Sequence, residues 1–121
     1  MAQHGTLIAI VDDQESVRKA LLRLLRLERF RAEAYASAAQ LLESLETTAP
    51  DCIVLDLHMP GMTGLDLLHH FRASANPPAV VVITADDTQE TERECLALGV
   101  TQYLRKPIDR QRLLDSVRAV T

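Results

Sequence analysis

The sequence of 121 residues has few aromatic side chains and only two cysteines. It contains no Trp, two Tyr and two Phe, so we expect a core of Val, Ile, Leu and Ala side chains. Cys52 and Cys95 lie far apart and fit no metal-ligand spacing, so we interpret both as structural residues. A chain of this length buries a sufficient core without disulfide bonds, and we expect one domain over residues 1–121.

The sequence also lacks an excess of positive charge and a long apolar run. Its formal net charge is −4, which gives no general attraction to phosphate backbones, so we do not expect this segment to bind nucleic acid directly. Residues 1–5 hold no apolar stretch, and the first apolar run is too short to cross a bilayer. We therefore expect a cytoplasmic protein that does not bind a membrane.

Five short apolar runs alternate with segments of helical period, a pattern typical of a parallel sheet with crossover helices. The predicted strands are Leu7–Val11, Arg31–Tyr35, Cys52–Leu55, Ala79–Ile83 and Gln102–Leu104. The predicted helices are Ser16–Glu28, a segment from the N-cap Ser37 through Leu45, Gly64–Arg72, Thr88–Leu98 and a last helix capped by Asp109. The fold class is therefore α/β, and a flavodoxin-like doubly wound sheet of five parallel strands in the order 2-1-3-4-5, with five helices, fits best.

Helical periodicity also predicts which side chains of the first and fourth helices face inward. The first helix should bury one apolar stripe and point its arginines outward. The stripe consists of Val17, Ala20, Leu21, Leu24 and Leu25, and the arginines are Arg18, Arg26 and Arg29. The fourth helix is polar for most of its length, so we expect it to be loosely held.

Five polar residues follow the predicted strands at their carboxyl ends. They are Asp12 and Asp13 after the first strand, Asp56 after the third, Thr84 after the fourth and Lys106 after the fifth. In a doubly wound sheet, ligands bind outside the carboxyl ends of the strands, where the strand order reverses. We therefore expect these side chains to meet at one site.

Three carboxylates at one site repel one another and need a neutralising partner. Mg²⁺ suits such oxygen ligands, and one or two carboxylates with a phosphoryl oxygen would complete its coordination. Lys106 would add a positive charge that reaches a phosphate from the opposite side. The cluster therefore indicates a Mg²⁺-dependent phosphoryl site.

Each residue also has a simpler interpretation. Asp12 or Asp13 could cap the helix that starts nearby, and Asp56 could begin a turn before Pro60-Gly61. Thr84 alone would be an ordinary strand-end residue, and Lys106 alone a solvated lysine. The coincidence of suitable groups at four strand ends favours the functional interpretation.

The residues of four segments resemble the receiver domain of two-component response regulators over essentially the whole chain. The segments are Ile8–Asp13, Val54–Gly64, Val82–Ala85 and Tyr103–Pro107, and the stretch from Asp56 to Leu65 is most similar to NarL/FixJ-type regulators. The resemblance implies a phosphorylation-activated switch, not an enzyme with turnover, whose own chemistry is limited to self-phosphorylation and self-dephosphorylation. Asp56 would accept a phosphoryl group from a histidine kinase or phosphotransfer protein.

The resemblance further implies the role of each site residue. Asp13 would bind Mg²⁺ directly and Asp12 largely through water, with Asp56 and the backbone carbonyl of His58 as further ligands. Lys106 would neutralise charge during the transfer. The His58 imidazole, together with Asp86, is a hypothesis for the control of water access and phosphoryl lifetime.

Phosphorylation should then change the surface of the fourth helix, fifth strand and fifth helix. By the resemblance, Thr84 moves inward and Tyr103 rotates into the vacated space. The altered surface would change the choice of output partner, control an attached DNA-binding domain or allow a phosphorylation-dependent homodimer. The Lys106-Pro107 bond is expected to be cis. The resemblance also implies that the kinase docks on the first helix and the loop after the fifth strand, with Arg18, Lys19 and Arg26 as candidate selectivity residues.

Three other functions fit parts of the pattern. A haloacid-dehalogenase-like phosphatase would need an acid two residues after Asp56, where this chain has His58. A flavodoxin-like cofactor binder would need a first loop rich in Ser, Thr and Gly, whereas residues 12–15 would repel a phosphate without a metal. A phosphorylation-independent adaptor of the same fold would not need the intact set of Asp13, Asp56, Thr84 and Lys106.

Overall fold

The computed structural model describes residues 6–85 and 88–121, and these residues form a five-stranded parallel sheet with five helices. The strands are β1 (Leu7–Val11), β2 (Arg31–Tyr35), β3 (Cys52–Asp56), β4 (Ala79–Thr84) and β5 (Gln102–Arg105), and the sheet order is β2-β1-β3-β4-β5. The helices are α1 (Glu15–Leu27), α2 (Ala38–Ser44), α3 (Gly64–Arg72), α4 (Gln89–Ala97) and α5 (Arg110–Val120). The predicted fold class, strand order and number of helices are confirmed.

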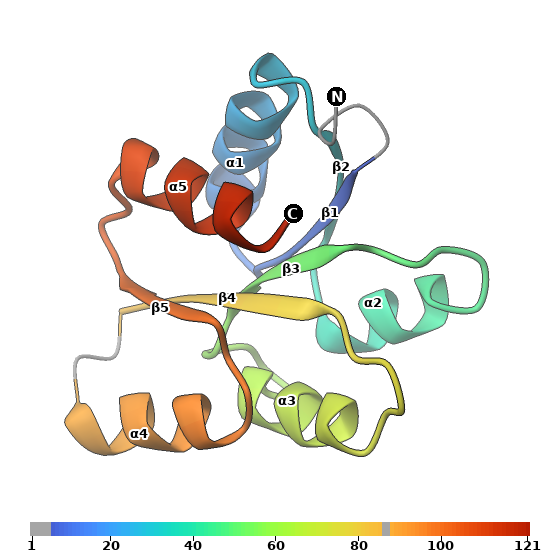
Figure 1. Cartoon of the computed structure of the whole chain (residues 1–121), viewed down its shortest axis with the longest axis vertical. Helices are drawn as coiled ribbons and strands as arrows, with labels where there is room; N and C mark the ends of the chain where they lie inside the picture. Colours follow the sequence, from blue (N-terminus) through green and yellow to red (C-terminus); the bar gives the residue numbers. More distant parts are fainter. Residues whose placement is uncertain (1–5, 86–87) are drawn as a thin grey trace.

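The helices cover both faces of the sheet (Figure 1). Helices α1 and α5 lie on one face, and α2, α3 and α4 lie on the other. Because side chains alternate along a strand, β1 buries Ile8 and Ile10 under the first group of helices and Ala9 and Val11 under the second. The three central strands β1, β3 and β4 are therefore buried on both faces, as their continuous runs of Val and Ile predict.

Local sequence signals explain where several helices begin and end. Ser37 caps α2 by accepting a hydrogen bond from the Gln40 backbone N–H, and Asp109 caps α5 in the same way. After α4, Gly99 has a φ of +96°, a conformation that favours glycine at the end of a helix. Both predicted caps and this predicted stop are confirmed.

Helix α4 buries only one of its side chains completely, that of Cys95. The scarcity of apolar contacts follows from its polar sequence, as predicted. Cys52 and Cys95 are both buried and unbonded to each other, and burial raises the pKa of the Cys52 thiol to about 12. These findings support the interpretation of both cysteines as structural residues.

Two predictions about α1 are wrong. Ala20, which was expected in the buried stripe, is exposed. Arg18, which was expected to face outward, is half-buried, and its Nη1 donates a hydrogen bond of 2.9 Å to the Asp12 backbone carbonyl. The helical period misplaces Arg18 because a long side chain at the start of a helix can fold back toward the preceding loop.

Among the described residues, no helix is long and apolar enough to span a membrane.

Candidate phosphoacceptor and metal site

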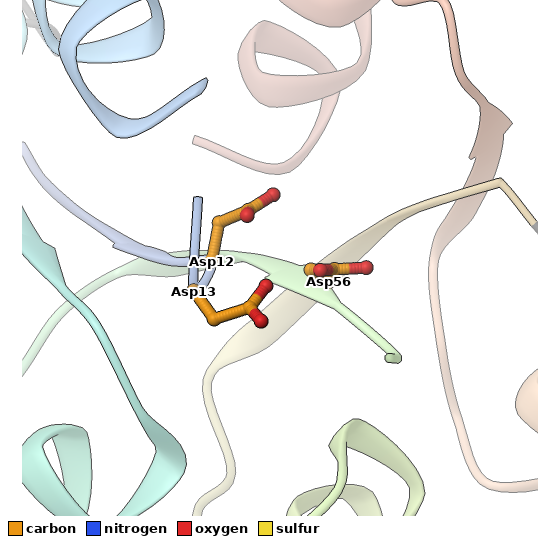
Figure 2. A group of neighbouring side chains, drawn as sticks. All are labelled: Asp12, Asp13 and Asp56. Carbon is orange, nitrogen blue, oxygen red and sulfur yellow. The ribbon is translucent and has the colours of Figure 1, made fainter. Parts of the chain in front are cut away.

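The carboxyl ends of β1 and β3 bring three aspartates together. β1 pairs with β3, so Asp12 and Asp13, directly after β1, lie beside Asp56, the last residue of β3 (Figure 2). One carboxylate oxygen of each aspartate lies within 4.8 Å of the corresponding oxygens of the other two. Asp12 is completely buried and Asp56 is 3% exposed, whereas Asp13 is exposed to solvent. The site is therefore open on the side of Asp13.

Lys106 contributes the opposing charge from the end of β5. Its Nζ lies 3.1 Å from Asp12 Oδ2 and 3.8 Å from Asp56 Oδ2. The backbone N–H of Lys106 donates to the carbonyl of Thr84 at the end of β4, which ties the lysine to the neighbouring strand. The Lys106–Pro107 peptide bond is cis, as the resemblance implies.

The charge balance at Asp56 is unfavourable to its ionised form. Burial and the negative charge of Asp12 raise the pKa of Asp56, while Lys106 and a hydrogen bond from the His58 backbone N–H oppose that shift. One amine therefore does not fully neutralise the three carboxylates. This residual negative charge is what a divalent cation would compensate.

Asp12 also has a structural role in the loop between β1 and α1. Its backbone N–H donates to the Tyr35 carbonyl, and its Oδ1 accepts a hydrogen bond of 2.8 Å from the backbone N–H of Gln14, the residue that precedes α1. The simpler interpretation of Asp12 as a group that stabilises the start of the helix is thus correct in part. The two roles are compatible because Oδ1 holds the helix start and Oδ2 faces Lys106.

Gly64 allows α3 to approach the end of β3. A Cβ atom at this position would lie 2.7 Å from both the Asp56 backbone oxygen and the Leu57 Cα, which is closer than real Cβ contacts allow. Its backbone N–H donates to the Leu57 carbonyl. Only a residue without a side chain fits here, and the turn that follows Asp56 is held against the helix as a result.

Thr84 and Tyr103 lie on β4 and β5, the two strands that follow β3 in the sheet order. Thr84 is completely buried at the end of β4, and Tyr103 is half-buried and packs against the apolar cluster under α3 and α4. The Arg105 guanidinium lies 5.8 Å from the centre of the Tyr103 ring, and its Nη2 lies 3.0 Å from Glu92 Oε1 on α4. Tyr103 is thus linked to α4 through Arg105.

His58 and Asp86 were predicted to control water access. The His58 side chain is exposed, and its backbone N–H donates to Asp56 Oδ1 at 3.2 Å. Asp86 lies outside the residues that the structure describes. The effect of both side chains on phosphoryl lifetime, and the use of the His58 carbonyl as a metal ligand, stay predictions.

The donor set fits a hard divalent cation. The three carboxylates offer only oxygen atoms, and neither cysteine is near enough to belong to the group that could hold a metal. The open side at Asp13 leaves room for water and a phosphoryl oxygen, which Mg²⁺ retains in its coordination shell.

Comparison with known proteins defines the class of this chain. Residues 8–118 match the family model of the response regulator receiver domain. The chain therefore belongs to the response regulator receiver family, whose members act as phosphorylation-activated switches in two-component signalling. Receiver domains typically bind Mg²⁺ at an acidic pocket.

Individual relatives support the assignment. The chain is 36% identical over 115 residues to the sensory transduction protein RegX3 of Mycolicibacterium smegmatis, which covers 95% of this chain and 50% of RegX3. It is 33% identical over 112 residues to the transcriptional regulatory protein FixJ of Azorhizobium caulinodans, which covers 93% of the chain and 53% of FixJ. The predicted resemblance to NarL/FixJ-type receivers is confirmed by these sequence identities. The chain spans about half the length of these relatives.

A solved structure with the same fold is a response regulator receiver protein from Burkholderia phymatum. It is 35% identical, has a TM-score of 0.83, and the match covers 95% of this chain and 94% of that one. The agreement over nearly the full length of both chains supports the receiver fold, and the family match favours a receiver domain over a flavodoxin-like cofactor binder of the same topology.

The raised pKa of Asp56 gives a testable effect on stability. The folded protein binds this proton more tightly than the unfolded chain does, so the free energy of unfolding falls as pH rises from the ordinary value of 3.8 through the raised folded value. In EDTA at neutral pH, Asp56→Asn should therefore be more stable than the wild type in urea unfolding. The gain in the free energy of unfolding should vanish when the pH is lowered below 3.8, the ordinary pKa of an aspartate.

Asp66→Asn is the matched control for this measurement. Hydrogen bonds from the backbone and side chain of Thr63 lower the pKa of Asp66, so this carboxylate stabilises α3 above its ordinary pKa and loses that effect as the pH falls. Its replacement should lower stability at neutral pH. A less stable Asp56→Asn protein under the same conditions would contradict the charge balance described above.

Proposed function

We propose that this domain accepts a phosphoryl group on Asp56 from a histidine kinase or phosphotransfer protein. The observation that carries the proposal is the convergence of three carboxylates and one amine at the ends of β1, β3 and β5. Separated by more than 40 residues in sequence, Asp13, Asp56 and Lys106 meet only because of the sheet order. Such a site neutralises and orients a phosphoryl group, which is most of what phosphoryl transfer requires.

In the proposed reaction, an Asp56 carboxylate oxygen forms a bond to phosphorus while the bond between phosphorus and the kinase histidine nitrogen breaks. The electron pair of the broken bond returns to the imidazole, and Asp56 becomes an acyl phosphate. Lys106, now beside Asp56 Oδ2, would pair with an oxygen of the transferred group. The same chemistry with a small phosphodonor would give self-phosphorylation, and attack by water would give self-dephosphorylation.

Mg²⁺ is the proposed metal. Asp13, Asp56 and the backbone carbonyl of His58 would hold it directly, and Asp12 would hold it largely through water. When bound, it would neutralise the negative charge that the phosphoryl group and the carboxylates share during the transfer. The Asp12 carboxylate is already bonded to the Gln14 N–H and to Lys106 Nζ. This supports a role in which it contacts the metal through a water molecule and not directly.

A hydrolytic enzyme with an aspartyl-phosphate intermediate is less well supported. Such an enzyme would use a general acid two residues after the acceptor, and His58 stands there with an exposed side chain. The family match also favours a switch over a catalyst with turnover. The product of the proposed reaction is therefore the phosphorylated domain itself.

Phosphorylation is proposed to alter the face formed by α4, β5 and α5. Tyr103, Arg105 and Glu92 form a continuous contact from β5 to α4, and α4 is held by little buried apolar surface. Inward movement of Thr84 and Tyr103 would remove the ring from below the Arg105 guanidinium and change that contact. The altered face would control an output partner, an attached DNA-binding domain or a second copy of the chain.

A groove beside α1 is the proposed docking site for the kinase. It has a volume of about 640 Å³ and is lined by α1 from Ser16 to Leu27 together with Ile108 and Arg110 after β5. Leu27 is 67% exposed, so the groove offers apolar surface to a helix of the partner. Arg18 and Arg26 donate to backbone carbonyls of this chain, whereas Lys19 pairs with Glu15 at the exposed surface, so Lys19 is the most accessible of the predicted selectivity residues.

Leu27→Glu tests this docking site. The charge would face the apolar surface of the partner, and we expect phosphotransfer from the cognate kinase to slow about tenfold, equivalent to about 1.4 kcal/mol. Phosphorylation by acetyl phosphate should be unchanged because Leu27 does not contact the acidic cluster. Equal rates with the kinase for Leu27→Glu and the wild type would remove the groove from the proposal.

Intact-mass measurement after incubation with acetyl phosphate and Mg²⁺ tests the central reaction. We expect the mass to rise by one phosphoryl group, because a single carboxylate is placed as acceptor. Asp56→Asn keeps the size of the side chain and removes the nucleophile, so it should show no gain. A phosphoryl group on the Asp56→Asn protein, or none on the wild type, would contradict the proposal.

The same phosphorylated sample reports on the switch. Backbone amide NMR signals of α4, β5 and α5 should shift on phosphorylation, and those of α2 should not. The Asp56→Asn protein under identical conditions provides the baseline. Shifts restricted to residues around Asp56 would show that phosphorylation does not reach the output face.

A further inference from the structure

We propose that Arg18 is a positioning residue for the metal site, which it serves by fixing the peptide between Asp12 and Asp13. The inference deepens the proposed function and rests on the proposed Mg²⁺ site. Its basis is a contact that the helical period of α1 did not predict. The guanidinium of Arg18 reaches back from the first turns of the helix to the loop that carries the acidic pair.

The contact completes a set of bonds that hold Asp12 on every side. The Asp12 N–H donates to the Tyr35 carbonyl, and Arg18 Nη1 donates to the Asp12 carbonyl at 2.9 Å. The side chain is held by the Gln14 N–H on Oδ1 and by Lys106 Nζ on Oδ2. Among the described residues, Arg18 therefore supplies the bond that fixes the carbonyl end of Asp12.

That carbonyl belongs to the same planar peptide as the N–H of Asp13. Fixing its oxygen fixes the direction in which the chain leaves Asp12, and with it the position of the Asp13 Cα. Within residues 6–85 and 88–121, no hydrogen bond or ion pair holds the Asp13 carboxylate itself. The direction of this carboxylate thus depends on the backbone that Arg18 holds.

The chemistry of Arg18 suits this task. Its guanidinium stays charged at any physiological pH and presents planar, directional donors, so the bond to the buried carbonyl is strong and oriented. Its side chain is half-buried against α1 and the loop, which limits its availability to a partner protein. We therefore assign Arg18 to the metal site and not to the selection of the kinase.

The test is a calorimetric titration of Mg²⁺ into the metal-free protein. Arg18→Met keeps the length and packing of the stem but has no donor, and we expect its dissociation constant for Mg²⁺ to rise about fivefold to tenfold, as for other groups that orient a metal ligand. Arg18→Lys restores a charged donor and should recover about half of the lost affinity. Lys19→Met, which removes the same charge from the adjacent exposed position, should bind Mg²⁺ like the wild type.

Phosphorylation by acetyl phosphate separates positioning from catalysis. In Arg18→Met, the Mg²⁺ concentration needed for half-maximal rate should rise with the dissociation constant, while the rate at saturating Mg²⁺ should stay within about twofold of the wild type. Circular dichroism checks the fold first, and Arg18→Leu, which also has no donor, replaces Arg18→Met if the latter does not fold.

The outcomes distinguish this inference from the proposed function. Unchanged Mg²⁺ affinity in a folded Arg18 variant without a donor, or an equal loss in Lys19→Met, would overturn the role of Arg18 and leave the phosphoacceptor site intact. A wild-type protein that binds no Mg²⁺ would overturn the proposed metal site, and the inference with it.

Discussion

The repulsion among three carboxylates at the end of a buried sheet is the interaction on which this site depends. Asp12 and Asp56 lie almost completely out of contact with water, where a negative charge is costly and a neighbouring one makes it more so. Lys106 reduces this cost but does not remove it, as the raised pKa of Asp56 indicates. The fold thus maintains a place with excess negative charge that favours a divalent cation, and a cation there would in turn allow a phosphoryl group beside Asp56.

The sheet supplies the rigidity that keeps these charges together. β1 and β3 are covered by helices on both faces, so their ends cannot move apart without disrupting both apolar clusters. By contrast, the contact proposed to respond to phosphorylation lies at the less buried β5 edge of the sheet, where Arg105 joins β5 to the weakly held α4. This division places the proposed acceptor on a fully buried part of the sheet and the proposed response on a part that is held by fewer buried contacts and changes at lower cost.

Much of this arrangement could be predicted from the sequence because its signals are local or topological. Runs of Val and Ile identified the buried strands, and the rule that ligands bind at the carboxyl ends of strands brought Asp13, Asp56 and Lys106 together. Arg18 and Gly64 were missed for a physical reason. The role of each depends on a backbone atom in the preceding loop, at 2.9 Å for the Arg18 donor and 2.7 Å for a Cβ at Gly64, and hydrophobic periodicity carries no information about such contacts.

The central claim is that the acidic cluster binds one divalent cation through Asp13. The most direct measurement is therefore a comparison of Mg²⁺ binding by the wild type and Asp13→Asn in isothermal titration calorimetry, with Asp66→Asn as a control for loss of an unrelated carboxylate. The account predicts one Mg²⁺ per wild-type chain, the same in Asp66→Asn, and an affinity at least about tenfold weaker in Asp13→Asn. Equal Mg²⁺ binding by the wild type and Asp13→Asn would contradict it.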